Sequence, residues 1–109
     1  MAIDNKAYLF HVSNTLSTSD KNKLRSAFSI YANDSETLQK NVVEPWQKRI
    51  FEYDENIWLI YMNVDLESMY EEISKVLADD AWFLMHIGDD YTGFTNSNFL
   101  NWMEFHLGY

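Results

Sequence analysis

The sequence predicts an α+β protein with one four-stranded antiparallel sheet and three helices. Two observations lead to this class. Short, almost wholly apolar runs, which are typical of strands covered on both faces, alternate with longer segments whose apolar residues follow a helical spacing. In addition, 47% of the 109 residues are hydrophobic, and there are only three glycines and one proline. An ordered core is therefore expected despite a net charge of −9.

The first part of the chain predicts a central strand and a helix. Residues 7–12 are apolar and rich in aromatic and branched side chains, as in a strand inside a sheet. Thr18 or Ser19 can cap the helix that follows, and its apolar stripe consists of Leu24, Ala27, Phe28 and Tyr31. Residues 33–43 fit either a helical turn or a loop, and we leave them unassigned.

The middle of the chain predicts a hairpin. Residues 46–53 combine Lys48, Arg49 and Glu52 with apolar side chains, as edge strands that discourage pairing with other sheets often do. Residues 54–56 suit the hairpin loop. Residues 57–62 are apolar on both faces and predict a second inner strand.

The remaining elements are a helix, a strand and a final helix. Asp65 is placed to cap an amphipathic helix, whose apolar stripe consists of Leu66, Met69, Tyr70, Ile73, Val76 and Leu77. Residues 81–87 predict a third apolar strand between two acidic turns. Residues 97–107 predict the last helix.

The order strand, helix, strand, strand, helix, strand, helix matches the ferredoxin-like βαββαβ arrangement with an extra C-terminal helix. We therefore expect a single domain over residues 1–109, with both main helices on one face of the sheet. In this topology the first and third strands are central and the second and fourth are edges. The first and third strands also have the most uniformly apolar sequences.

The charges divide unevenly along the chain. Up to Arg49 there are seven Lys or Arg residues and five Asp or Glu residues. From Ile50 onward a single lysine, Lys75, accompanies twelve carboxylates, a net of −11. Such a surface repels nucleic acid and anionic membranes and attracts basic partners. A basic protein partner is therefore expected, and direct binding of nucleic acid through the C-terminal half is not.

The composition and the first residues of the chain argue against several classes of protein. Without cysteine, the chain has no disulfide, no thiolate zinc site and no cysteine nucleophile. The first residues lack the basic and apolar regions of a signal peptide, and no apolar run approaches the roughly 20 residues of a membrane span. We therefore expect a soluble cytoplasmic protein.

Several motifs between Trp46 and Trp102 form a known pattern. They are an edge strand that begins with Trp, an inner strand containing Trp58, an amphipathic helix, Asp79-Asp80 before the last strand, and Tyr-Thr-Gly-Phe at residues 91–94 leading to Trp102. In these motifs the chain resembles the SinR-type and VapD-like relatives of the CRISPR adaptation endoribonucleases. The resemblance implies a ferredoxin-like fold and, in nuclease members, a homodimer whose first strand ends in an Asp that helps hold a divalent metal.

This sequence has a different residue at the position of that Asp. Ser13 or Asn14 stands there, and neither is a strong ligand for a hard cation. The resemblance therefore implies that the nuclease chemistry has been lost. No metal site is expected from His11, His86 and His106 either, because the first two lie near strand ends that point in opposite directions. We predict no cofactor and no metal.

The candidate binding residues are carboxylates and aromatic side chains of the second half. The two Asp pairs, the second with Tyr91, could grip a partner's Arg or Lys, although turn formation and solvation explain each pair more simply. The final helix has more apolar width than one stripe buries, so part of it is expected to face a partner or a second copy. The candidate set is Glu67, Glu71, Glu72, Asp79, Asp80, Asp89, Asp90, Tyr91, Trp102 and Phe105.

These observations predict a non-enzymatic acidic module that occupies a basic surface on a protein partner. An inhibitor, an immunity protein or a nucleic-acid mimic acts in this way, for example a phage-encoded anti-defence (anti-CRISPR) or toxin-neutralising protein. Two alternatives remain open. One is a metal-dependent endoribonuclease of the resembled family acting as a homodimer, and the other is a catalytically inactive structural homodimer.

Overall fold

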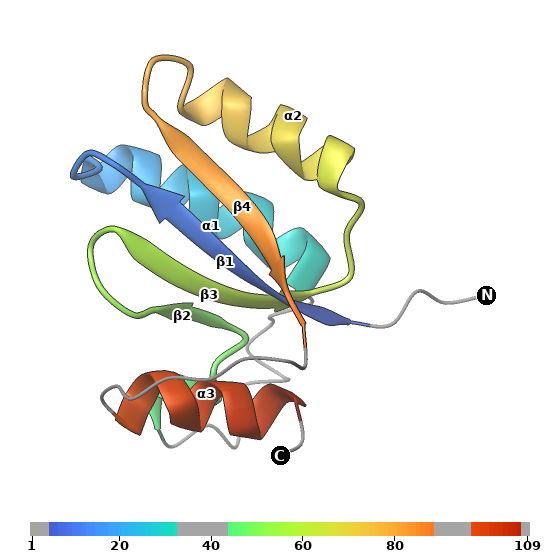
Figure 1. Ribbon diagram of the computed structural model, residues 1–109. Coiled ribbons are helices and arrows are strands. Elements are labelled where there is room, and N and C mark those ends of the chain that lie inside the picture. The colour runs from blue at the N-terminus through green and yellow to red at the C-terminus, as the bar shows by residue number, and fades with distance from the viewer. Residues whose placement is uncertain (1–4, 33–43, 89–96, 108–109) are drawn as a thin grey trace.

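The computed structural model describes residues 5–32, 44–88 and 97–107 (Figure 1). In these residues it contains four strands, three α-helices and one short 3-10 helix. In chain order they are β1 (Lys6–Val12), α1 (Thr18–Ala32), η1 (Pro45–Gln47), β2 (Ile50–Glu52), β3 (Ile57–Met62), α2 (Leu66–Val76), β4 (Trp82–Ile87) and α3 (Ser97–Leu107). The predicted α+β class is confirmed.

The four strands form one sheet in the order β2-β3-β1-β4, and all neighbouring strands are antiparallel. Leu9 in the middle of β1 lies opposite Leu59 of β3 on one side and Met85 of β4 on the other. The first and third strands are therefore central and the second and fourth are edges, as predicted. The segment left unassigned, residues 33–43, lies outside the described residues.

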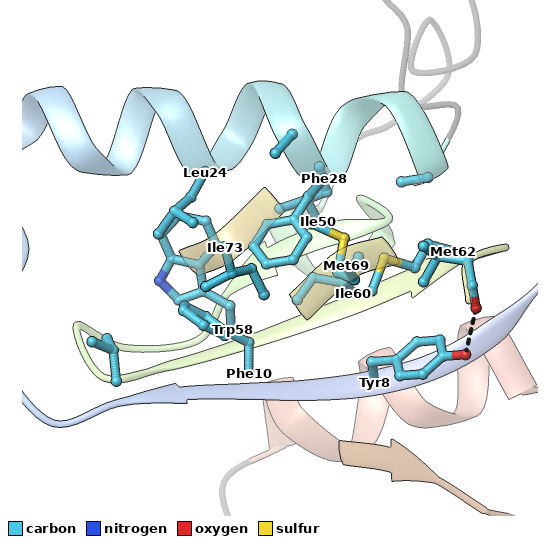
Figure 2. Packing of buried hydrophobic residues seen from close by; sticks show 14 of the residues in the cluster. Tyr8, Phe10, Leu24, Phe28, Ile50, Trp58, Ile60, Met62, Met69 and Ile73 are labelled. Carbon is cyan, nitrogen blue, oxygen red and sulfur yellow. Dashed lines mark hydrogen bonds between the residues drawn. The ribbon is translucent and has the colours of Figure 1, made fainter. Parts of the chain in front are cut away.

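The main core lies between the sheet and the helices α1 and α2. Because side chains alternate along a strand, every second residue of the central strands faces this layer. Figure 2 shows Phe10, Trp58 and Ile60 of the sheet beneath Leu24 and Phe28 of α1 and Met69 and Ile73 of α2. The Phe10 ring lies 5.5 Å from the Phe28 ring and 5.9 Å from the Trp58 ring. Both main helices therefore cover one face of the sheet.

A second, smaller core lies on the opposite face of the sheet, under α3. Its fully buried side chains include Leu59 of β3 and Trp102 and Met103 of α3. The Trp102 Nε1–H donates a hydrogen bond of 3.0 Å to the Lys48 carbonyl oxygen. The C-terminal helix is thus more than an appendage, because it closes part of the second face.

The start of β2 differs from the prediction of a strand over residues 46–53. Pro45 begins the 3-10 turn instead, and the Glu44 N–H donates to the Gln47 side-chain oxygen at 2.9 Å. Proline is well suited to the first position of a helical turn, since it has no N–H to donate. The strand itself begins at Ile50, so β2 has only three residues.

The N-terminus of α2 is capped as predicted. The Asp65 carboxylate accepts the N–H groups of Glu67 at 3.3 Å and Ser68 at 3.2 Å. The apolar stripe predicted for this helix is wrong in two positions. Met69 and Ile73 are fully buried, but Leu66 and Tyr70 are exposed, because they lie on the flank of the helix rather than toward the core.

Candidate protein-binding surface

An aromatic ring stands among exposed carboxylates on α2. Tyr70 is 63% exposed, and its ring lies 5.4 Å from that of Trp82 at the start of β4. Glu67 lies one helical turn before Tyr70, and Glu71 follows it directly; both are exposed. We call Leu66, Glu67, Tyr70, Glu71 and Asp79 the α2–β4 surface, because Asp79 is exposed in the turn that joins these two elements.

Two other predicted carboxylates of this region have partners within the chain. Glu72 lies 3.4 Å from the Lys75 ammonium, one turn further along α2. The Asp80 carboxylate accepts a hydrogen bond of 3.0 Å from the Asn14 side-chain amide. Asp80 therefore ties the turn before β4 to the loop after β1. Glu72 and Asp80 are therefore engaged within the chain, and we do not include them in the α2–β4 surface.

The remaining predicted site residues lie elsewhere. Trp102 is fully buried and packs on the opposite face of the sheet, so its ring is not available to a partner. Phe105 is 52% exposed, but it belongs to α3, where its ring lies 5.8 Å from Trp46. The structure thus separates the α2 carboxylates from the α3 aromatics. Asp89, Asp90 and Tyr91 lie outside the described residues.

Both arginines of the chain make contacts within the fold, one of them with a carboxylate of the second half. Arg25 of α1 holds the Glu52 carboxylate of β2 through two contacts, Nε to Oε2 at 2.6 Å and an Nη to Oε1 at 2.8 Å. The hydrogen bond to Glu52 raises the pKa of Arg25 above its usual value, with burial acting in the opposite direction. Arg49 donates to the Ala32 carbonyl oxygen at 2.7 Å and lies over the Tyr61 ring. Both arginines of the chain are therefore engaged within the fold.

A small cavity of about 240 Å³ lies at the hairpin end of the sheet. It is lined by Lys21, Glu52, Asp54, Glu55 and Trp58. Glu52 is held by Arg25, and Asp54 accepts the backbone N–H groups of Asn56 at 2.8 Å and Ile57 at 2.7 Å. Two of its three carboxylates therefore have structural roles, and the cavity offers no distinct constellation for catalysis.

The histidines are spread over the molecule. His86 lies opposite Tyr8 and His11 lies opposite Phe83, so the two occupy opposite ends of the β1–β4 ladder, as predicted. Burial lowers the pKa of His106 to about 4, and the carbonyls of Lys48 and Trp46 oppose this effect. Within residues 5–32, 44–88 and 97–107, no group of three or more His, Asp or Glu side chains is arranged to hold a metal ion.

Sequence reasoning missed several exposed apolar side chains. The sequence places Leu66 and Tyr70 on the apolar stripe of α2, and Phe83 and Met85 in an apolar edge strand with no prediction of which side chains stay exposed. The tyrosine hydroxyl was a signal for exposure at Tyr70, because a buried one needs a hydrogen-bond partner. Nothing in the sequence of β4 indicated that Ile87 would pack against the second core while Phe83 and Met85 stay exposed.

Comparison of the chain with protein-family models, with curated proteins and with solved structures gives no match. In the part of the chain that the structure describes, no helix combines the length and the apolar character needed to cross a membrane.

Proposed function

We propose that this protein is a non-enzymatic binding module whose α2–β4 surface occupies a basic site on a protein partner. An inhibitor, an immunity protein or a nucleic-acid mimic of this kind blocks its partner by covering a surface that otherwise binds an anionic ligand. The observation that carries the proposal is the environment of Tyr70, an exposed ring packed against Trp82 and accompanied by the exposed carboxylates Glu67 and Glu71.

This combination suits a protein interface. Tyrosine is enriched among the residues that dominate binding energy, because its rigid ring buries a large area with little loss of entropy. Packing of Tyr70 against Trp82 holds the ring in place before a partner arrives. Carboxylates around such an anchor steer a basic partner toward it and exclude acidic ones. The surface therefore supplies both an anchor and a charge that selects its partner.

The finer fold assignment is part of the same proposal. We infer a ferredoxin-like arrangement, which the strand order β2-β3-β1-β4 and the position of α1 and α2 on one face support. The sequence of β1 contains no Asp or Glu, and Ser13 and Asn14 follow this strand. This supports a binding role within the resembled family rather than metal-dependent cleavage of RNA.

A pull-down from cell lysate at low salt tests the proposed function. The immobilised wild-type protein is expected to retain a basic protein that is released as salt is raised, because screening weakens interactions between exposed charges. Mass spectrometry identifies the retained protein and gives its isoelectric point. Retention of no basic protein, or retention that salt does not affect, would show that the proposal is wrong.

Two charge variants make this test specific to the surface. Replacing Glu67→Gln and Glu71→Gln removes two exposed carboxylates from α2. Replacing Glu44→Gln and Glu104→Gln removes the same charge from the α3 side, where both residues are also exposed. We expect the first variant to lose retention and the second to keep it. Equal loss in both would mean that overall charge, and not this surface, governs binding.

A further inference from the structure

The two edges of the sheet differ in their protection. The β2 edge is short, follows Lys48 and Arg49, and is anchored to α3 through the Lys48 carbonyl oxygen, which Trp102 Nε1–H and His106 contact at 3.0 and 3.1 Å. The β4 edge has six residues, with the sequence WFLMHI, and contains no Lys, Arg, Asp, Glu or Pro. Proteins usually protect an edge strand with such residues or with a covering element. Figure 1 shows β4 on the outside of the sheet, with β1 as its neighbour.

The register identifies which backbone groups of β4 point outward. Ser13 N–H donates to the Ala81 carbonyl oxygen at 2.9 Å, and the same register pairs His11 with Phe83 and Leu9 with Met85. Hydrogen-bonded pairs alternate with non-bonded ones in an antiparallel ladder. The N–H and C=O groups of Phe83, Met85 and Ile87 therefore face β1. Those of Trp82, Leu84 and His86 face away from the sheet.

Exposed apolar side chains lie along this edge. Phe83 is 48% exposed and Met85 is 49% exposed, and both lie on the sheet face opposite α1 and α2. The Phe83 ring stacks on the His11 ring at a centroid distance of 5.1 Å. On the other side of the strand, Trp82 contacts the exposed ring of Tyr70. An added strand would thus find both outward-facing backbone groups and apolar contacts along β4.

The charges next to β4 indicate the chemistry of the strand it accepts. Asp79 and Asp80 precede β4, and Glu67 and Glu71 are exposed near Tyr70 on α2, whose ring contacts Trp82. A second copy would bring no Lys or Arg to this edge, because its β4 contains neither. An extended segment that carries Lys or Arg beside its apolar residues would pair with these carboxylates. We propose that β4 binds an extended strand of a basic partner by edge-to-edge pairing, a mode that rests on the proposed function.

Amide hydrogen exchange with a defined probe tests this mode. The probe is a short synthetic peptide of alternating valine and threonine with lysines at both ends. In the free protein, the amides of Trp82, Leu84 and His86 should exchange rapidly, while those of Phe83, Met85 and Ile87 are protected by β1. With the peptide bound, the first three amides should exchange at least roughly tenfold more slowly, because each outward N–H gains a partner or is shielded by the added strand.

Two matched variants test whether the peptide binds at the β4 edge or through any exposed apolar side chain. Met85→Lys adds a positive charge to the exposed face of β4, as natural edge strands do to prevent pairing. Ile30→Lys makes the same change at a side chain of α1 that is 75% exposed. The first substitution is expected to abolish the peptide-induced protection and the second to leave it intact. Circular dichroism confirms that both variants fold.

Each other outcome overturns the proposal in a distinguishable way. If the peptide shifts the signals of Glu67, Tyr70 and Glu71 but leaves the β4 amides unprotected, edge pairing is wrong and the proposed function stands. If a peptide with glutamates in place of the lysines protects β4 equally, the basic partner is wrong. If protection rises with protein concentration alone, β4 pairs with a second copy. If no condition protects these amides, the edge does not accept a strand.

Discussion

Trp102 and Phe105 lie three positions apart on α3 and have opposite surroundings. Trp102 is fully buried and donates to the Lys48 carbonyl oxygen, whereas Phe105 is half exposed beside Trp46. Replacing Trp102→Ala removes a large buried side chain and a hydrogen bond, so we expect it to lower the free energy of unfolding by about 3–5 kcal/mol. Phe105→Ala is expected to cost about 1 kcal/mol or less. Denaturant unfolding of both variants measures the difference.

Comparison of these two variants tests whether Trp102 belongs to the second core and Phe105 to the surface. Similar losses in the two variants would contradict the placement of Trp102 in the second core. A selective loss for Trp102→Ala supports it.

His106 makes stability depend on pH. Its pKa is lowered to about 4 by burial in the folded protein, compared with 6.5 for an unperturbed histidine. Between these values the unfolded chain binds a proton that the folded protein does not, so stability is highest above about pH 6.5 and falls as the pH drops toward about 4. The carbonyl of Lys48 can only accept, so Nε2 of the neutral ring carries the hydrogen that it donates there.

The expected loss from His106 between about pH 7 and about pH 5 is about 1–2 kcal/mol of unfolding free energy. The His106→Gln variant keeps a side-chain N–H donor but cannot titrate, so it should lose less stability over this range. Denaturant unfolding at both pH values, for wild type and variant, measures the two slopes. Identical slopes would contradict a partly buried, neutral His106.

At the scale of elements, the capping of α2 is a local and testable contribution. Asp65 accepts the N–H groups of Glu67 and Ser68 and the Ser68 hydroxyl, and these bonds hold the pKa of its carboxyl below the usual value. Replacing Asp65→Ala leaves the donors without this partner and is expected to cost about 1 kcal/mol of unfolding free energy. Glu71→Ala, on the exposed middle of the same helix, should change stability by less than about 0.5 kcal/mol. Equal losses in thermal or denaturant unfolding would argue against the cap.

The elements could be predicted where a local pattern decides them. The bounds of β3 and α3 follow directly from their apolar spacing, and the Asp65 cap from a polar residue before an amphipathic run. The prediction is wrong at the start of β2. Trp46 favours a strand there, but Pro45 begins a 3-10 turn that includes Trp46. The pattern also did not indicate which side chains of β4 stay exposed, because the packing of α3 on the sheet is a tertiary feature with no local signal.

The candidate site was predicted in part for the same reason. Exposure of Glu67 and Glu71 follows from their position opposite the apolar stripe, and the structure places them there. The prediction that Trp102 meets a partner was based on the apolar width of its helix. That width is used to fill a second core instead, since Met103 and Leu59 bury the Trp102 side of α3. The contact of Tyr70, the proposed anchor, with Trp82 could not be predicted from the sequence, because it depends on where α2 lies relative to β4.

At the scale of the whole molecule, the division of charge along the sequence does not keep the two halves of the chain apart. The fold interleaves the two halves of the chain in one sheet, and Arg25 of the first half neutralises Glu52 of the second. The α2–β4 surface combines exposed carboxylates with the exposed Tyr70 ring and adjoins an edge strand without charged residues. We therefore propose that a partner binds on this side of the molecule and not on α3.

The dissociation constant of the purified partner for the two charge variants tests this account most directly. Neutralising Glu67 and Glu71 together should raise Kd roughly fivefold or more, because it removes about 1 kcal/mol or more of favourable interaction with basic groups. The Glu44→Gln and Glu104→Gln variant, with the same net charge, should bind like the wild type apart from a small general effect. An unchanged Kd in the α2 variant, or a larger rise in the α3-side variant, would contradict the account.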